Sequence, residues 1–552
     1  MNWKKFAGIG VILGLLIGLT ACAAGADTKK ENVQADSDNQ EKIINMMEIN
    51  EISSMDSGNA LDGGSFIAIT QVIEGLYNLD DEDNIIPGVA EKLPEISEDG
   101  LTYTVSLRKN ATWSNGDPVT AHDFVYAWRR VVTPSFGSPS SFLLADIKNT
   151  SKILEGKAEP ETLGVEAKDD YTLLVTLEHP VAYFTSVMTF PTLFPQNQKY
   201  VEKQGENYAL DSDHLIYNGP YRLAEWKHGN QKWVYEKNDH YWNKEQSNVK
   251  AVNIQVVKDT NLAVNLFKDG QLDRAVLSGE YAKQYKKDKN YTTQLDSWVH
   301  TLELNQKKED KATIFANKSI RQAIGLAIDR EHIANTLLDN DSRAIYGLIP
   351  SEFVKNPESN EDFRKESGDI QSFDVEKAKT LWQKGLKELG EKTATLQLSA
   401  SDQDENKAIT EYLQYTLQEN LPDLTVEISL VPEKNLLDKK QSHDFDLMLT
   451  RQGPDFQDPT TYLNTYQTEA FNNPSVYSNE TYDKLLAQAQ TESNQLETRW
   501  QTLIKAEHTL LEDAAVIPIY QSANTALLRD NITGMIHHLF GPPNFYGKIM
   551  LK

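Results

Sequence analysis

Apolar residues recur at the three- and four-residue spacing of an amphipathic helix in several separate segments. The most regular of these is 318–336, in which isoleucine and alanine side chains fall on one face. In the first such segment, Glu74-Gly75 is expected to close the helix, because glycine is common just past a helix C-terminus. The predicted helices are 66–77, 121–132, 318–336, 374–389 and 405–419.

Alternation of apolar and polar residues predicts β-strands between these helices. The segment 98–115 reads as a strand pair, and Asn115-Gly116 after it is a strong hairpin-turn dipeptide. Thr120 and Asp123 fit a capping box at the start of helix 121–132. The other predicted strands are 171–177, two within 232–257, 394–400, 424–431 and the apolar run 445–449. Helices and strands are mixed throughout, which predicts the α/β class.

The N-terminus has the pattern of an export signal. Lys4 and Lys5 precede an uncharged stretch of 15 residues, 7–21. A membrane-spanning helix needs about 20 apolar residues, so residues 1–21 are predicted to be a signal peptide. The stretch ends in Leu-Thr-Ala-Cys22, which resembles the lipobox of bacterial lipoproteins. That resemblance implies lipidation of Cys22, and residues 22–40 are polar enough to form a tether.

Composition narrows the range of functions. The chain has 552 residues, more than one hydrophobic core usually holds, so two or three lobes are expected. Its net charge of −26 disfavours nucleic acid as a partner. Cys22 is the single cysteine, so lipidation would leave no thiol chemistry.

Catalytic and metal-binding patterns are missing from the sequence. It contains no G-x-S-x-G, H-E-x-x-H, G-x-G-x-x-G or Walker-type glycine loop. Of the eleven histidines, His537 and His538 are adjacent in sequence, and neighbours in a chain do not form a metal site. The sequence therefore predicts a protein that is not an enzyme and has no catalytic residue, cofactor or metal.

Five sequence blocks, taken in order, resemble the large peptide-binding proteins of ABC importers, solute-binding family 5. The resemblance is to the oligopeptide-binding lipoproteins of that family and covers essentially the whole mature chain. Arg108, Trp113 and Trp128 in the first block, and Arg321 and Asp329 in the third, are interpreted as structural residues. The blocks are 98–130, 218–242, 319–333, 453–463 and 513–520.

The resemblance implies a two-lobed α/β fold like that of periplasmic binding proteins, with an extra N-terminal domain and a ligand cleft between the lobes. The lobes of such proteins close on the ligand by hinge motion. The implied boundaries are 40–86, 210–296 and 520–552 for lobe I, 87–209 for the extra domain, and 297–519 for lobe II.

The resemblance also implies a site for an extended peptide, held mainly through its backbone. Asp455 matches the family's Asp that binds the ligand ammonium, and Arg451 and Gly453 share its parity along an extended chain. The matching segment of the opposite lobe is Glu74-Gly75-Leu76. Asp458 is interpreted as an ordinary loop or helix-cap residue.

This sequence departs from the family pattern next to Asp455. Arg451 and Gln452 stand where the family has Gly and Trp, and the family's cation for the peptide carboxylate falls on Leu449. The mode of C-terminal capture therefore does not carry over, and Arg451 is a candidate replacement for the cation.

The implied function is capture of short peptides and their delivery to the permease and ATPase subunits of an importer. The protein is expected to be a monomer on the outer face of a Gram-positive-type cell membrane. Its only attachment to the membrane is expected to be the lipid on Cys22, which includes palmitate. Two alternatives stay open: a paralogue that binds a peptide pheromone, and a relative that binds nickel chelates, haem or sugars.

Overall fold

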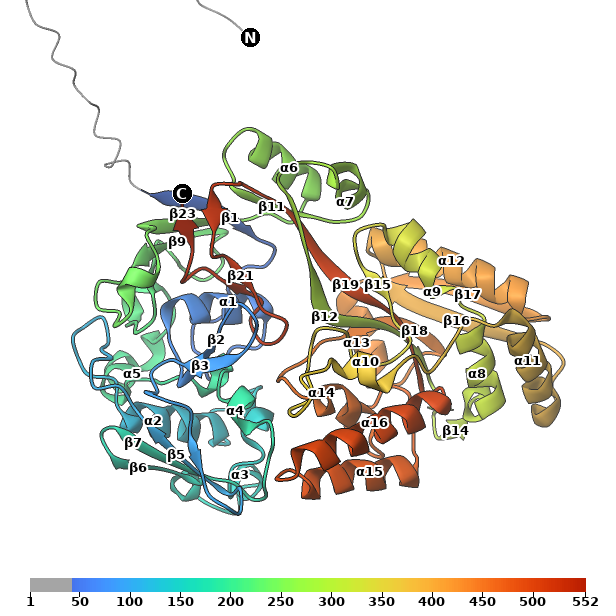
Figure 1. The fold of residues 1–552 in the computed structure, drawn as a ribbon, viewed down its shortest axis with the longest axis horizontal. Helices are drawn as coiled ribbons and strands as arrows, with labels where there is room; N and C mark the ends of the chain where they lie inside the picture. The colour runs from blue at the N-terminus through green and yellow to red at the C-terminus, as the bar shows by residue number, and fades with distance from the viewer. Residues whose placement is uncertain (1–41) are drawn as a thin grey trace, which may run out of the picture. The chain divides into compact units, whose positions relative to one another are not determined.

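Three larger β-sheets organise residues 42–552, the part of the chain that the computed structural model describes (Figure 1). The predicted signal peptide, Cys22 and the predicted tether lie outside these residues. The first sheet has the order β1-β10-β9-β8, and its β1 and β10 are parallel although 208 residues separate paired positions Ile43 and Ala251. Its strands are β1 (Ile43–Glu48), β10 (Ala251–Val256), β9 (Lys232–Lys237) and β8 (Tyr221–Ala224).

The second of the three sheets, called the small sheet below, is antiparallel and has the order β4-β5-β7-β6. Helix α2 (Ala121–Val132) contacts it and begins as predicted, because the Asp123 carboxylate accepts the Thr120 N–H at 2.8 Å. Trp113 and Trp128 are buried in the core beside it, which confirms their structural interpretation. The strands are β4 (Glu95–Ile96), β5 (Thr102–Ser106), β7 (Thr172–Thr176) and β6 (Val165–Asp169).

The large sheet has the order β11-β19-β12-β18-β16-β17 and mixes parallel with antiparallel pairs. Its strands are β11 (Arg274–Leu277), β19 (Val516–Leu528), β12 (Tyr291–Leu304), β18 (Leu447–Gln452), β16 (Ala394–Ser401) and β17 (Leu424–Val431). The main helices packed around it are α8 (Lys318–Leu326), α11 (Val375–Leu389), α12 (Asp404–Asn420), α13 (Glu433–Gln441), α15 (Glu480–Thr491) and α16 (Leu496–Glu512).

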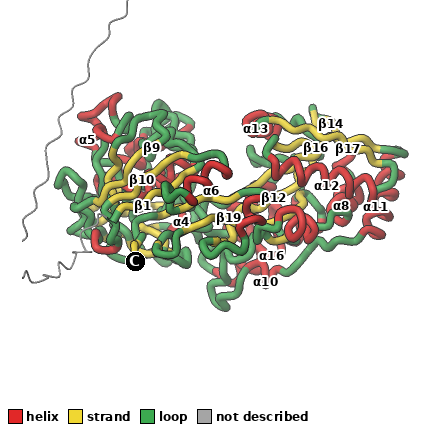
Figure 2. Tube along the Cα trace, turned by 90° about the horizontal axis from the view of Figure 1, so that it is seen from above, coloured by secondary structure: helices red, strands yellow, loops and turns green. Residues whose placement is uncertain are grey.

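Strands β12 and β19 are the longest of the described strands and run side by side, as Figures 1 and 2 both show. Their pairing shifts in register at two places, between Leu295 and Val299 and between His300 and Thr301. The expected boundaries between lobes I and II, 296/297 and 519/520, fall within these two strands. The domain boundaries themselves stay predictions.

The hydrophobic cores follow the sheets. One core joins the first sheet, the small sheet and α1 (Gly63–Val72), and it includes Ile532, Tyr546 and Ile549 from the C-terminus. Two further cores lie against β19, and consecutive residues Val516 and Ile517 belong to different ones. Neighbouring residues of a strand point to opposite faces, so this strand is packed on both sides.

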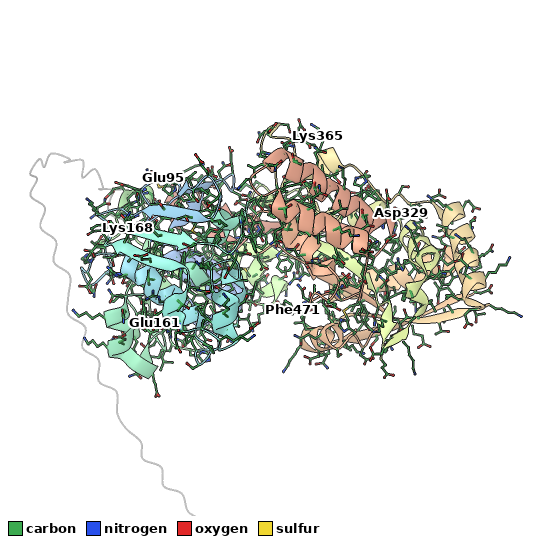
Figure 3. All side chains as sticks on the ribbon, turned by 90° about the horizontal axis from the view of Figure 1, so that it is seen from below. Glu95, Glu161, Lys168, Asp329, Lys365 and Phe471 are labelled. Atoms are coloured by element: carbon green, nitrogen blue, oxygen red, sulfur yellow. The ribbon has the colours of Figure 1, made fainter. Side chains whose placement is uncertain are left out.

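Two predicted helices differ from the observed ones. Helix α1 ends at Val72, before Glu74-Gly75, because Ile73 is extended and Asn218 binds both the N–H and the carbonyl of Glu74 at 3.0 Å. The predicted helix 318–336 is broken after Leu326. Asp329, labelled in Figure 3, caps a new helical turn by accepting the His332 N–H at 3.1 Å.

Arg321, interpreted from the sequence as a structural residue, is buried and donates to the carbonyls of Phe315, Ala316 and Asp513. The predicted strand 445–449 is displaced to 447–452, so it reaches into the predicted ligand segment. Across residues 42–552, none of the helices has the length and apolar character needed to span a membrane.

Candidate functional site

A cavity of about 360 Å³ opens between segments assigned by sequence to lobe I and segments assigned to lobe II. Its walls come from the end of β1, from α1, from β11, β12, β18 and β19, and from the starts of α12 and α13. Among the described residues, no group of three His, Asp or Glu side chains is placed to hold a metal ion. The charged and imidazole-bearing residues of the wall are Glu48, Arg274, Asp296, His300, Glu405, Glu433, Arg451 and His537.

Three side chains lie in a row across the middle of the large sheet. His300 in β12 is paired with Tyr520 in β19 and with Arg451 in β18, and directly opposed residues project from the same face. The rings of His300 and Tyr520 are stacked with centroids 4.1 Å apart. The Tyr520 hydroxyl donates to Glu405 at 2.8 Å. The row thus connects the sheet to the first turn of α12.

Arg451 extends the row onto an aromatic surface. Its guanidinium lies 4.7 Å from the centroid of the Trp298 ring, which is 38% exposed. Contacts of this kind are worth about 0.5–1 kcal/mol at exposed sites. Gly453 packs on the same indole, and a Cβ at this position would come within 2.8 Å of it. A larger residue at this position would therefore have to displace the indole from the backbone.

Two titratable groups of the cavity wall are shifted in pKa. Burial, and then the nearby Arg451, lower the pKa of His300 to about 3, so its imidazole is neutral at physiological pH. Burial raises the pKa of Asp296 to about 6, with opposition from the Ser297 N–H and from Arg451. Desolvation favours the uncharged form of each group.

Asp455 lies just beyond this row, outside the cavity wall. Its backbone N–H donates to the Thr461 hydroxyl at 3.0 Å. Within residues 42–552, its carboxylate has no hydrogen bond and no ion pair within 4.0 Å. Solvent reaches the side chain, yet enough protein surrounds it to raise its pKa to about 6. A crowded carboxylate without a cation is a suitable receptor for an ammonium group.

The residues after Asp455 are fixed on both sides. The Phe456 ring is stacked on Tyr183 of the predicted extra domain, with centroids 4.2 Å apart, and the Gln457 N–H donates to Ser186 at 2.9 Å. Asp458 forms two 2.7 Å bonds with Arg499 of α16 and accepts the Thr460 N–H at 3.0 Å. Asp458 precedes α14 (Thr460–Leu463), whose N-cap is Pro459, so it lies in the loop before the helix. Its contacts fix the loop that carries Asp455.

The predicted segment of the opposite lobe, Glu74-Gly75-Leu76, is buried away from the cavity wall. The Glu74 carboxylate accepts bonds from Tyr241 at 2.6 Å, Trp242 at 2.7 Å and Asn78 at 2.9 Å. Burial raises its pKa, and these three bonds oppose the rise. The carboxylate is therefore occupied by internal partners, and the ligand role of this segment stays a prediction.

The structure thus brings Arg451 into the cavity wall and places Gly453 and Asp455 beside it. It also adds residues that sequence reasoning missed, chiefly Arg274, Asp296, His300 and Glu405. The sequence carries only a weak signal for Arg274 and His300, because Arg274 directly precedes the apolar run Ala-Val-Leu and His300 directly follows Trp-Val. A polar residue in a buried strand needs a partner or a function.

Comparison with known sequences decides the family. A sequence model described as bacterial extracellular solute-binding proteins, family 5 (middle), matches residues 84–474. The chain belongs to this family. Its fold is the two-lobed α/β fold of the family 5 binding proteins, as the sequence resemblance implied.

Similar proteins of family 5 cover nearly the whole chain. The dipeptide-binding protein of Lactococcus lactis subsp. cremoris is 34% identical over 98% of both chains. Listeria monocytogenes OppA, solved with bound peptide, is 42% identical with a TM-score of 0.78, covering 93% of this chain and 99% of its own. The pheromone receptor PrgZ is 36% identical with a TM-score of 0.79, covering 93% and 100%. Such family 5 proteins bind peptides for transport.

Proposed function

We propose that this chain is the substrate-binding lipoprotein of an ABC importer, which captures short peptides between its two lobes and delivers them to the permease. The observation that carries the proposal is the carboxylate of Asp455, which has no cation partner among the described residues and lies beside the walled cavity. The peptide-binding relatives support it. The protein binds its ligand without chemistry and acts as a monomer.

The proposal is tested by identifying what the protein carries. Native mass spectrometry of protein purified from its own cells should show a mixture of short peptides. After these are removed, added peptide should raise the melting temperature. At a hundredfold excess over the dissociation constant, binding adds about 2.7 kcal/mol to the free energy of unfolding. The peptide should be recovered intact. Cleaved peptide, or no thermal shift with any peptide, would overturn the proposal.

A second candidate function is supported by the likeness to the pheromone receptor PrgZ. A paralogue devoted to one signalling peptide would bind a single sequence tightly. The same mass spectra separate the two functions, because a nutrient importer carries many masses and a pheromone receptor carries one.

We further propose that Cys22 anchors the protein to the outer face of the cytoplasmic membrane. The lipobox-like sequence and the polar tether support this. One acyl chain gives marginal membrane binding, and stable anchoring takes two, which a diacylated cysteine provides. The Cys22→Ala variant should therefore appear in the medium, or stay uncleaved in the membrane. Fractionation and the mass of the N-terminus measure this. A variant still processed and anchored like the wild type would refute lipid attachment at Cys22.

A further inference from the structure

A buried cation in the cavity wall has no partner of its own. Arg274 begins β11, is 5% exposed and lines the cavity. Within the described part of the chain, its guanidinium makes no hydrogen bond and no ion pair within 4.0 Å. Buried arginines are normally paired, because an isolated buried charge is strongly unfavourable. Arg274 is thus an unpaired cation that faces an open volume.

The position of Arg274 is fixed by its neighbour in the chain. Asp273 accepts the Asn45 N–H at 2.8 Å and donates its own N–H to the Asn45 carbonyl at 2.7 Å. Its carbonyl accepts the Arg529 N–H at 3.0 Å. Asp273 is therefore tied to the first sheet and to the end of β19. A side chain carried on so constrained a backbone is pre-organised for binding.

Among the described residues, the titratable groups that face Arg274 are bonded to other partners or uncharged at neutral pH, and none forms an ion pair with it within 4.0 Å. The Glu48 carboxylate is bonded to Tyr546 and Asn544, and burial raises its pKa against the smaller, opposing effects of Tyr546 and Arg274. Burial, and then Arg274, lower the pKa of His537 to about 4, so this imidazole is neutral at pH 7. His538 beyond it is bonded to Asp83 at 2.7 Å.

We propose that Arg274 binds a carboxylate of the peptide ligand and thereby selects for peptides that carry one. This rests on the proposed function, because it assigns a subsite within the same cavity. A guanidinium can bind a carboxylate through two parallel hydrogen bonds, and burial makes an anionic ligand the group that best satisfies the cation. The carboxylate can come from the peptide C-terminus or from an Asp or Glu side chain.

The second arginine of the cavity wall, Arg451, provides a matched control. It is exposed and stacked on Trp298, so solvent already screens its charge. A carboxylate paired with an exposed cation gains little affinity, typically less than about fivefold. Arg274, which is buried, should therefore distinguish peptides with a carboxylate from peptides without one more strongly than Arg451 does.

Calorimetry with two peptide pairs tests the proposal and separates the two sources. The first pair is trialanine with a free or an amidated C-terminus. The second is Ala-Ala-Glu-amide against Ala-Ala-Gln-amide. In at least one pair, the wild type should bind the carboxylate-bearing peptide about 30-fold more tightly. The pair that shows the preference identifies the source. Arg274→Gln should lose it, Arg274→Lys should keep part of it, and Arg451→Gln should keep it.

Three results would overturn the proposal: equal binding within both pairs by the wild type, an unchanged preference in Arg274→Gln, or loss of the preference in Arg451→Gln alone. The first needs no variant, so misfolding cannot obscure it. Melting temperature adds an independent readout, because removing an unpaired buried cation should stabilise the empty protein, whereas removing a structural partner of Glu48 should destabilise it. If the wild type bound none of the four peptides, the proposed function would fail as well.

Discussion

Replacing Asp455 by Asn should weaken binding of a short peptide by about 30-fold or more while leaving the fold intact. The lobes of such binding proteins close on their ligand, so we expect the proposed pair between Asp455 and the peptide ammonium to be buried in the complex. Removing one member of a buried charge pair costs roughly 2–5 kcal/mol, and each 1.4 kcal/mol corresponds to about tenfold in affinity. The carboxylate has no partner among the described residues of the empty protein, so its loss breaks no internal ion pair. The effect should therefore appear in ligand affinity, measured by calorimetry.

A double-mutant cycle assigns this loss to the ligand ammonium. N-acetylation of the peptide should weaken binding to the wild type by a similar factor. The Asp455→Asn variant should lose much less on acetylation, because both changes remove the same interaction. If the wild type binds acetylated and free peptide equally well, Asp455 has another role and the ligand is held by other groups.

The pH dependence of affinity gives a second check on Asp455. With its pKa raised to about 6, the carboxylate is mostly ionised at pH 7 and mostly protonated at pH 5. The peptide ammonium keeps its proton over this range, so affinity should fall about tenfold from pH 7 to pH 5. Asp296 also titrates near pH 6, so any fall that persists in Asp455→Asn belongs to other groups such as Asp296.

The same raised pKa has the opposite consequence for stability. An acid whose pKa is higher in the folded than in the unfolded state stabilises the fold below the unfolded pKa, and this contribution is lost as pH rises through the folded pKa. The empty Asp455→Asn protein should therefore melt at a higher temperature than the wild type at pH 7. The difference should vanish near pH 4. A variant that binds less tightly but melts higher would indicate a residue kept for binding.

Replacing Glu507 by Gln should destabilise the protein by about 3–5 kcal/mol, the usual effect of breaking a buried ion pair. Glu507 in α16 is 0% exposed and accepts the backbone N–H groups of Leu348 at 2.8 Å and Ile349 at 2.9 Å. It also binds both terminal nitrogens of Arg364, at 2.6 and 2.9 Å. The variant would leave the Arg364 charge buried without a counter-ion.

An exposed pair is the control for Glu507. Glu480 and Lys484 form an i,i+4 pair with side chains 83% and 72% exposed, so Glu480→Gln should destabilise the protein far less than Glu507→Gln does. Melting temperature and hydrogen exchange in α16 provide the comparison. Equal losses in the two variants would contradict the dominant role of Glu507. Gly347→Ala should resemble Glu507→Gln, because a Cβ there would overlap the Arg364 guanidinium, 1.4 Å away.

Local pattern predicted the regular elements of the fold well and its breaks poorly. Helix 121–132 and strand 424–431 were predicted with their observed bounds, because periodicity, capping and turn signals agree there. The helix expected at 318–336 is broken because Arg330 is pulled inward to bond the Pro518 carbonyl at 2.6 Å. That partner lies 188 residues away, so no local pattern could indicate it.

The residues of the candidate site likewise fall into those that the sequence could group together and those that it could not. Arg451, Gly453 and Asp455 occupy alternate positions of one extended segment, and the family resemblance was enough to group them. Arg274 and His300 lie on β11 and β12, which are consecutive along the chain but are separated in the sheet by β19 from near the C-terminus. That both line one cavity therefore depends on the order of the strands in the sheet. Sheet order across long connections is a tertiary property, and the sequence pattern carries little information about it.

If the chain is exported as proposed, the core that contains residues from both ends of the described part of the chain sets the order of folding. Tyr546 completes this core and donates to Gln71 through its N–H at 2.8 Å. A chain emerging N-terminus first therefore cannot finish its N-terminal half until the last residues have crossed the membrane. Segments 43–73 and 215–256 must wait with apolar surface exposed, a state prone to aggregation. Holding factors at the exit of the secretion channel would therefore act mainly on the half that emerges first.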